Sequence, residues 1–122
     1  MDKAETEVKM IRIIILNRLR NEIYKIFKKD SMKIYSLIEE LQTTPQKGKI
    51  LGHVGNMSIR ELRYKNFRFY FIVDGHKAYL LHKDQIHELL IRFVRMSTKN
   101  NQQKTIDEIK DILEKIGEEG FD

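Results

Sequence analysis

Cysteine and tryptophan are absent from the 122-residue sequence, and proline occurs once, at Pro45. Without cysteine the chain forms no disulfide, binds no metal through thiolates and has no thiol nucleophile. Long apolar runs are also missing, because the most apolar stretch, residues 10–16, contains Arg12 and is far shorter than a membrane span. Residues 1–9 carry three acids and two lysines, unlike the basic start of a signal peptide. The sequence therefore predicts a soluble cytoplasmic protein that does not enter a membrane.

Motifs for metal and nucleotide binding are lacking as well. His82 and His87 are five residues apart, which fits no helical or strand spacing of metal ligands. His53 and His76 fall in or beside expected turns. The segment GKILGHVG (48–55) places its Gly-Lys pair first, whereas a phosphate loop ends on that pair followed by serine or threonine. We therefore expect no metal site and no cofactor.

Charge is abundant but unevenly distributed. Charged residues make up 34% of the chain, and the formal net charge is +5. Residues 100–122 contain three lysines and seven acids, a net charge of −4, so residues 1–99 carry +9. A basic body with an acidic tail indicates a surface that binds polyanions and is shielded by the tail or by an acidic partner. A lysine-rich surface without a partner explains the charge equally well.

The first half of the chain predicts a strand, two helices and a loop. Residues 8–16 are rich in β-branched side chains and fit a buried strand, although their apolar spacing also fits the start of one long helix. Asn17 is a candidate N-cap of the first helix and Ser31 of the second, which together form an αα-hairpin. Pro45 follows the second helix, as expected of a helix stop. Residues 43–57 hold the single proline and three of the six glycines, and are predicted to be a loop.

The segment RELRYKNFRFYFIVDG (60–75) alternates aromatic and charged side chains in the manner of two paired strands. Asp74-Gly75 predicts a two-residue hairpin turn that pairs Phe71 with Ala78, and Lys65-Asn66 is a weaker candidate for the preceding turn. Alternation then divides the side chains between two faces. The expected core face carries Leu62, Tyr64, Phe67, Phe69, Phe71, Val73, Ala78 and Leu80. The opposite face carries Ile59, Glu61, Arg63, Arg68, Tyr70, Ile72 and Tyr79.

The charged part of this second face has two interpretations. It is either a solvated sheet face with an ion pair that contributes under about 1 kcal/mol, or a site for an anion. Arg63 and Arg68 are expected directly opposite one another, where like charges repel. A phosphate between them would remove that repulsion, because guanidinium groups bind phosphate in a bidentate manner. Tyr70 offers a surface on which a base can stack. We favour the phosphate site.

The last third of the chain completes the predicted fold. Residues 89–97 fit a strand or a helix, and periodicity does not separate the two. Residues 105–117 have the spacing of an amphipathic helix that ends at Gly117. The sequence therefore predicts an α+β fold: a small antiparallel sheet, mixed at one edge, with an N-terminal αα-hairpin on one face and a C-terminal helix. We expect one domain over residues 1–122, with a core at about 8–116 and a flexible tail at 117–122.

These segments, taken in order, resemble the RelE/ParE toxin superfamily, in particular its RelE and HigB-like branches. The resemblance covers roughly residues 8–116 and rests on the strand–helix–helix order, GKILGHVGNM before RELR, the FRFYF strand, and FVRMSTKN before the helix DEIKDIL. It implies a RelE-like sheet with the hairpin on one face. RelE-type members cleave mRNA in the ribosomal A site, and ParE-type members inhibit DNA gyrase. A cognate antitoxin neutralises both and often displaces or covers the final helix.

The resemblance also implies roles for individual residues. Arg68 matches the arginine that contacts the scissile phosphate, and Arg95 falls in or next to the basic pair where RelE-type enzymes place a catalytic arginine. Glu61 occupies a position that is glutamate in HigB-like sequences. These three are the expected catalytic residues. The residues expected to bind RNA are Arg63, Lys65, Tyr70 and Lys99.

The implied reaction is a transesterification without metal. Glu61 takes the proton from a ribose 2′-hydroxyl, and the 2′-oxygen attacks the adjacent phosphate. Arg63 and Arg68 stabilise the charge that develops there, while Arg95 assists the leaving 5′-oxygen. The expected partners are therefore the ribosome, mRNA and a cognate antitoxin protein. An alternative is a binding protein of the same fold without enzymatic activity, including a ParE-like gyrase inhibitor, which Met96 after Arg95 and the lack of tyrosine in residues 100–113 favour.

Overall fold

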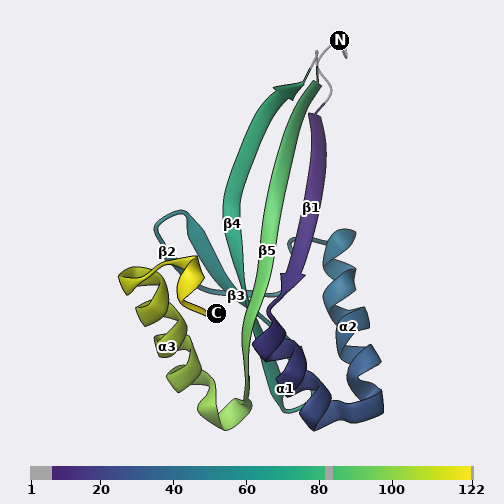
Figure 1. Cartoon of the computed structure of the whole chain (residues 1–122), viewed down its shortest axis with the longest axis vertical. Coiled ribbons are helices and arrows are strands. Elements are labelled where there is room, and N and C mark those ends of the chain that lie inside the picture. The colour runs from purple at the N-terminus through teal and green to yellow at the C-terminus, as the bar shows by residue number, and fades with distance from the viewer. Residues whose placement is uncertain (1–6, 82–83, 122) are drawn as a thin grey trace.

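The computed structural model describes residues 7–81 and 84–121, and the side chains of residues 11–74 and 89–121. One five-stranded sheet with the strand order β1-β5-β4-β3-β2 organises the chain (Figure 1). Strands β1 and β5 pair in parallel, and all other neighbours in the sheet are antiparallel. The elements are β1 (Glu7–Ile15), α1 (Asn17–Phe27), η1 (Lys28–Asp30), α2 (Ser31–Glu39), η2 (Glu40–Gln42), β2 (Lys49–Val54), β3 (Met57–Tyr64), β4 (Phe67–Leu81), β5 (Asp84–Thr98), η3 (Lys99–Asn101), α3 (Gln102–Lys115) and η4 (Glu118–Phe121). The predicted α+β fold, antiparallel but mixed at one edge, is confirmed. In the described part of the chain no helix has the length and apolar character needed to cross a membrane.

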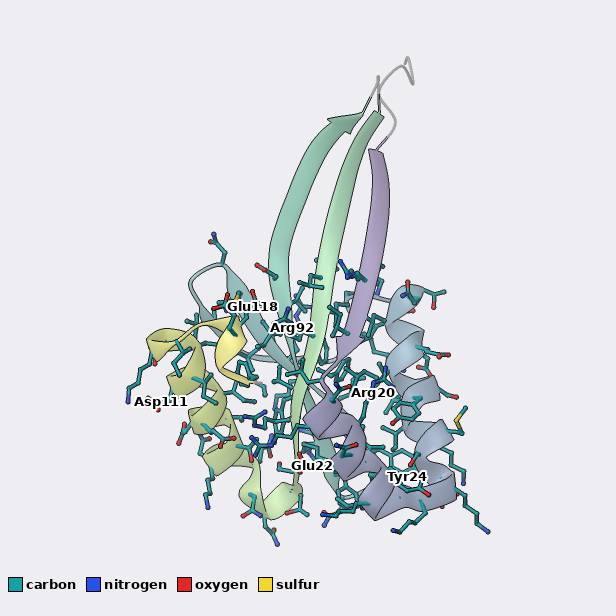
Figure 2. All side chains as sticks on the ribbon, viewed as in Figure 1. Arg20, Glu22, Tyr24, Arg92, Asp111 and Glu118 are labelled. Atoms are coloured by element: carbon teal, nitrogen blue, oxygen red, sulfur yellow. The ribbon has the colours of Figure 1, made fainter. Side chains whose placement is uncertain are left out.

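Helix α3 covers one face of the sheet, and the chain then folds back beside it. Gly117 ends the helix as predicted, with a φ of +99° and its N–H donating to the Ile112 carbonyl at 3.0 Å. The 3₁₀ turn η4 follows and buries Phe121 completely. Its Glu118 lies 3.9 Å from Arg92 of β5 (Figure 2). Residues 117–121, where the sequence predicts a flexible tail, thus include a 3₁₀ turn whose Phe121 is buried, and Asp122 lies outside the described residues.

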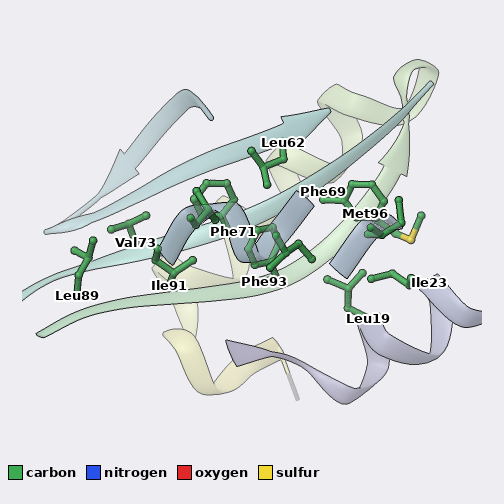
Figure 3. Close-up of a cluster of buried hydrophobic side chains, with 13 residues drawn as sticks. Leu19, Ile23, Leu62, Phe69, Phe71, Val73, Leu89, Ile91, Phe93 and Met96 are labelled. Carbon is green, nitrogen blue, oxygen red and sulfur yellow. The ribbon is translucent and has the colours of Figure 1, made fainter. Parts of the chain in front are cut away.

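The αα-hairpin of α1 and α2 covers the other face and builds the larger core, as predicted. Its buried side chains pack against alternate residues of β3, β4 and β5 (Figure 3). Asn17 begins α1 without capping it, and the Ser31 hydroxyl donates to the Ile23 carbonyl at 3.4 Å, which ties the two helices together. The residues of this core are Leu19, Ile23, Ile34, Ile38, Leu41, Leu62, Phe69, Phe71, Val73, Leu89, Ile91, Phe93 and Met96.

The pairing of β3 with β4 follows the prediction. Lys65 and Asn66 form a two-residue turn, in which Lys65 has a φ of +53°. Leu62 therefore pairs with Phe69, and Arg63 with Arg68. The two faces alternate as expected between residues 59 and 73, while the side chains of Ala78, Tyr79 and Leu80 lie outside those that the structure describes.

The predicted hairpin turn at Asp74-Gly75 is wrong. Strand β4 continues through this point to Leu81 and pairs with β5, where Leu81 is opposite Asp84. Asp74 pairs with Leu90 and Lys77 with Glu88, so two residues of β4 face a single residue of β5. Asp-Gly therefore occupies a β-bulge, a second backbone feature that favours glycine and that sequence alone does not separate from a turn.

Three further segments differ from the expected loop or resolve an open alternative. Residues 49–54, predicted to be loop, form the edge strand β2, whose pairing with β3 shifts register between Ile50 and Gly52. This bulge breaks the alternation that identifies a strand in a sequence. Residues 89–97 belong to β5, so the helical alternative is wrong. The alternative that residues 8–16 begin a long helix is also wrong, because residues 7–15 form the strand β1.

Candidate functional site

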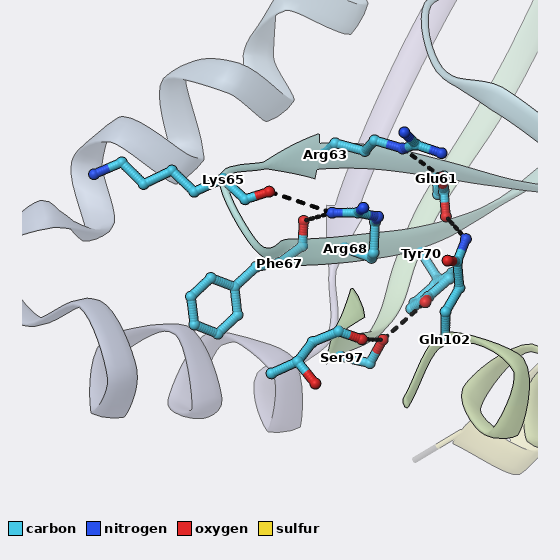
Figure 4. A network of polar contacts seen from close by, with 9 residues as sticks. Glu61, Arg63, Lys65, Phe67, Arg68, Tyr70, Ser97 and Gln102 are labelled. Atoms are coloured by element: carbon cyan, nitrogen blue, oxygen red, sulfur yellow. Dashed lines mark hydrogen bonds and ion pairs between the residues drawn. The ribbon is translucent and has the colours of Figure 1, made fainter. Parts of the chain in front are cut away.

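Polar side chains of three neighbouring strands meet on the sheet face that α3 covers. The strand register aligns Glu61 of β3 with Tyr70 of β4 and Arg95 of β5. A second row aligns Arg63, Arg68 and Ser97 in the same way. As the sequence predicts, this face is opposite the αα-hairpin. We define the polar cluster as these six residues together with Gln102 of α3: Glu61, Arg63, Arg68, Tyr70, Arg95, Ser97 and Gln102. Figure 4 labels all of them except Arg95.

A third β-bulge, between β4 and β5, places Arg95 in this cluster. Tyr70 pairs with Arg95 whereas Phe71 pairs with Phe93, so Val94 has no direct partner in β4. Val94 packs in the apolar cluster under α3, and the next residue, Arg95, also contacts α3. Two consecutive side chains therefore face the same way, an arrangement that simple alternation cannot predict.

The Glu61 carboxylate is fully buried and both of its oxygens are occupied. Oε2 accepts a hydrogen bond from Arg63 Nε at 2.9 Å, and Oε1 accepts one from Gln102 Nε2 at 2.8 Å. The Arg63 side chain is 54% exposed, so it connects the buried carboxylate to the surface. Gln102 lies 41 residues away in the sequence, and its amide belongs to no motif that would have identified it. The helix α3 thus holds the residue that the resemblance assigns as the base.

Arg68 is buried with little to neutralise its charge. The residue is 6% exposed, and its Nη1 donates to the backbone carbonyls of Lys65 and Phe67 at 3.3 and 3.2 Å. Its Nε is buried without a hydrogen-bond partner, and among the described residues no carboxylate forms an ion pair with it. A buried donor without a partner costs about 1–3 kcal/mol. An anion bound beside this guanidinium would recover that cost.

Arg95 is equally buried, at 5% exposed, but it is neutralised. Its Nε donates to Glu108 Oε1 of α3 at 3.2 Å, and its Nη1 donates to the Val94 carbonyl at 2.8 Å. The guanidinium also lies 5.1 Å from the centre of the Phe121 ring, within the range of a cation–π contact. Glu108 of α3 therefore pairs with the Arg95 guanidinium, and Phe121 of η4 packs against the face of the same group.

Tyr70 is held inside the cluster rather than displayed on its surface. Its hydroxyl and the Ser97 hydroxyl form a hydrogen bond of 2.8 Å, and Ser97 donates to the Thr98 carbonyl, so Tyr70 is the donor to Ser97. Burial raises the pKa of the Tyr70 phenol. The ring is fully buried, so the stacking surface expected from the sequence is closed in this arrangement. Ser97 was not predicted, because one hydroxyl in a strand carries no recognisable pattern.

Lys65 and Lys99 lie on the exposed rim of the cluster. The Lys65 ammonium lies 5.4 Å from the centre of the Tyr64 ring, and the Lys99 N–H donates to the Asn66 carbonyl at 2.9 Å. This backbone bond brings the β3–β4 turn next to η3. The seven predicted site residues therefore fall into an accessible rim of Arg63, Lys65 and Lys99 and a buried interior of Glu61, Arg68, Tyr70 and Arg95.

Metal ligands do not gather anywhere in the part of the chain that the structure describes, where no three histidines or acids form a group suited to an ion. His53 is exposed on β2. His82 lies outside the described residues, as do the side chains of His76 and His87. The chemistry available to the polar cluster is therefore that of carboxylate, guanidinium, amide and hydroxyl groups.

Comparisons of the chain with protein-family models, curated proteins and solved structures found no match.

Proposed function

We propose that this protein is a toxin of the RelE/ParE superfamily that acts as a ribosome-dependent, metal-independent mRNA endoribonuclease in a type II toxin–antitoxin system. The observation that carries the proposal is the guanidinium of Arg68, which is buried on the sheet face and forms no ion pair with a carboxylate of the described residues. The order of elements and the position of the αα-hairpin agree with the resemblance seen in the sequence motifs. The exposed cations Arg63, Lys65 and Lys99 beside the cluster suit an RNA backbone.

The proposed reaction forms one bond and breaks one bond at phosphorus. Glu61 takes the proton of a ribose 2′-hydroxyl, and the 2′-oxygen forms a new bond to the adjacent phosphorus as the bond to the 5′-oxygen breaks. The leaving 5′-oxygen takes a proton from water, and Glu61 returns the proton it took to the solvent, so the products are a 2′,3′-cyclic phosphate and a 5′-hydroxyl end. Arg63 and Arg68 stabilise the added negative charge, and Arg95 stabilises the leaving oxygen.

Helix α3 has to move before RNA reaches the inner residues. Gln102 occupies one oxygen of Glu61, and Glu108 pairs with Arg95, so both contacts break when the N-terminal half of α3 departs. Contact with the ribosome, or with mRNA in the A site, would replace these two contacts. We propose the cytoplasm as the location and a cognate antitoxin as the partner that keeps the protein inactive.

A second candidate is a non-enzymatic member of the superfamily, such as a gyrase inhibitor. The observation that favours it is the complete occupation of Glu61, whose two oxygens both accept hydrogen bonds inside the protein. In this case the exposed rim binds a partner, Arg95 only connects β5 to α3, and Arg68 only supports the β3–β4 turn.

Controlled expression in growing cells separates the two candidates. Pulse labelling should show that translation stops first, with cleaved mRNA and intact DNA, whereas a gyrase inhibitor should cause DNA breaks while mRNA stays whole. The Lys115→Ala variant should behave as the wild type in this experiment, because Lys115 is exposed on α3 and paired with Asp111, away from the polar cluster. DNA breaks without mRNA cleavage would replace the first proposal with the second.

A further inference from the structure

A cleft lies between the edge strand β2 and the start of α3, and of the polar cluster only Gln102 lines it. Its volume is about 550 Å³, within the range of about 300–1,000 Å³ common for ligand sites. Lysines from three different elements line it: Lys49 of β2, Lys99 of η3 and Lys110 of α3. We refer to this feature as the lysine cleft. Of these three lysines, the sequence analysis expects only Lys99 to bind RNA.

The three lysines of the lysine cleft are not neutralised within the protein. No carboxylate lines the cleft, and none of the three forms an ion pair with another described residue. Lysines elsewhere on the surface do form such pairs, for example Lys33 with Asp30 and Lys115 with Asp111. The cleft therefore concentrates positive charge that no ion pair among the described residues neutralises.

Lys110 of α3 lies close to a glycine in β2. A Cβ atom at Gly52 would lie 3.1 Å from Lys110 Cε and 3.3 Å from its Nζ, so the end of this lysine packs against the backbone of the edge strand. Helix α3 is acidic overall, yet its residue next to β2 is this lysine. Two elements that are distant in the sequence thus bring their cations to one edge of the sheet.

The lysine cleft leads toward the polar cluster. A second cleft of about 350 Å³ shares Lys49 with it and is also lined by Lys47, Glu61 and Arg63. Arg63 is the exposed residue that hydrogen-bonds the buried Glu61. Cations therefore continue from Lys110, through Lys49, to the rim of the proposed reaction site.

We infer that the lysine cleft, while α3 is in place, binds the sugar–phosphate backbone of single-stranded RNA beside the polar cluster, before α3 moves and admits RNA to the inner residues. The inference rests on the proposed function and adds a binding site for the flanking RNA. Lysine ammonium groups bind phosphates as point charges and need no fixed geometry, which suits a flexible backbone. The amides of Asn100 and Gln103 and the half-exposed Ile50 line the same cleft and can contact ribose and bases. Recognition of this kind depends on charge rather than on base sequence.

The test is the salt dependence of RNA binding. The probe is a labelled single-stranded RNA with 2′-O-methyl groups throughout, which cannot be cut because it lacks 2′-hydroxyls. Its affinity for the full-length protein is measured by fluorescence anisotropy at several salt concentrations. Each phosphate contact of a single strand contributes about 0.7 to the slope of log affinity against log salt. The triple variant Lys49→Ala, Lys99→Ala, Lys110→Ala should therefore lower the slope by about 2.

The control removes the same charge elsewhere. Lys29→Ala, Lys33→Ala, Lys115→Ala also loses three lysines, from η1, α2 and the end of α3, and should keep the wild-type slope within about 0.7. Replacing the three cleft lysines by arginine should preserve the slope, because the charge remains. Equal slopes for the two alanine variants would overturn the inference. So would loss of binding to a polyglutamate peptide, without loss of RNA binding, in the cleft variant, because the cleft would then serve an acidic protein.

Failure of this inference can be distinguished from failure of the proposed function. If the wild-type protein binds the uncut RNA through the cleft lysines but leaves natural mRNA intact on translating ribosomes, the nuclease proposal fails and the binding site stands. If the wild-type protein cuts mRNA while both alanine variants bind RNA alike, the nuclease proposal stands and the binding site fails.

Discussion

Arg68 has the least satisfied environment of any described charged residue in the polar cluster. Its neighbour Arg95 is just as buried but has Glu108 and the Phe121 ring, whereas Arg68 has only two long bonds to carbonyl groups. Natural proteins retain a group that costs stability mainly where function needs it. A binding role for an anion gives Arg68 such a reason.

Arg68→Met should separate stability from function. Methionine has a similar length and no charge, and replacing a buried ion by an apolar side chain is often neutral or stabilising. We expect the free energy of unfolding in urea to stay within about 1 kcal/mol of the wild type or to rise, while mRNA cleavage falls at least about 100-fold, as for loss of one preorganised donor. A loss of stability above about 3 kcal/mol would instead identify Arg68 as an anchor of the β3–β4 turn.

Phe69, the neighbour of Arg68 in β4, is an apolar side chain on the opposite face of the sheet. It is fully buried among the residues of the hairpin core, so Phe69→Ala should cost about 3–5 kcal/mol of unfolding free energy. Tyr24→Ala is the control, since Tyr24 is an exposed aromatic on α1, and it should cost under about 1 kcal/mol. Urea denaturation measures both. Equal losses would show that Phe69 does not belong to the core.

Which side chains share a face could be predicted, but which of them touch could not. Alternation placed Glu61, Arg63, Arg68 and Tyr70 together because a strand repeats every two residues. The contact between Glu61 and Gln102 depends on how α3 docks, which no local pattern contains. For this reason the sequence predicted that these four side chains share a face, and it missed the contact with Gln102 and the burial of the cluster.

At the level of elements, the errors of prediction fall at β-bulges. Asp74-Gly75 lies in one, Gly52 beside another, and Val94 in a third. Each bulge interrupts the two-residue period, so a continuous strand resembles a turn, a loop or an ambiguous segment in the sequence. The elements without bulges, such as β3 and the helices of the αα-hairpin, were predicted correctly for the same reason.

The 3₁₀ turn η4 should make stability depend on pH through Glu118. Burial, followed by a side-chain hydrogen bond with Asp74 and the charge of that residue, raises the pKa of Glu118 above the ordinary 4.5. The folded state therefore binds a proton more tightly than the unfolded chain. The stabilising contribution is fully present below pH 4.5 and is lost as the pH rises through the raised pKa.

Glu118→Gln removes this pH dependence because glutamine stays neutral. Relative to the wild type, the urea midpoint of the variant should rise as the pH increases from about 4.5 through the raised pKa. Glu114→Gln, exposed on α3 and not among the charges that act on Glu118, is the control and should track the wild type. A difference between Glu118→Gln and the wild type that is constant with pH would contradict this role of η4.

At the scale of the whole molecule, the acidic C-terminal segment neutralises part of the basic body. Glu108 pairs with Arg95 and Glu118 lies beside Arg92, so this segment reaches arginines of β5. The shielding by the tail that the charge pattern suggested therefore exists for these arginines. The lysine cleft keeps its charge, and with a net charge of +5 the molecule should attract polyanions at low salt.

The overall fold was easier to predict than the burial of the polar cluster under α3. Hydrophobic spacing specified the helices, the sheet and the face that the αα-hairpin covers, since these follow from periods of 3.6 and 2 residues. The position of α3 over the polar cluster follows from Ile106, Ile109 and Leu113 packing against Tyr70 and its neighbours. A sequence shows that such a helix is amphipathic but not which surface it covers.

The most direct test of the central claim uses purified ribosomes that translate a defined mRNA. The wild-type protein, the Arg68→Met variant and the Lys115→Ala control are each added, and the ends of the mRNA fragments are mapped. The account predicts fragments with 2′,3′-cyclic phosphate and 5′-hydroxyl ends for the wild type and for Lys115→Ala, and at least about 100-fold slower cleavage for Arg68→Met. Intact mRNA in the presence of folded wild-type protein, or cleavage that Arg68→Met leaves unchanged, would contradict it.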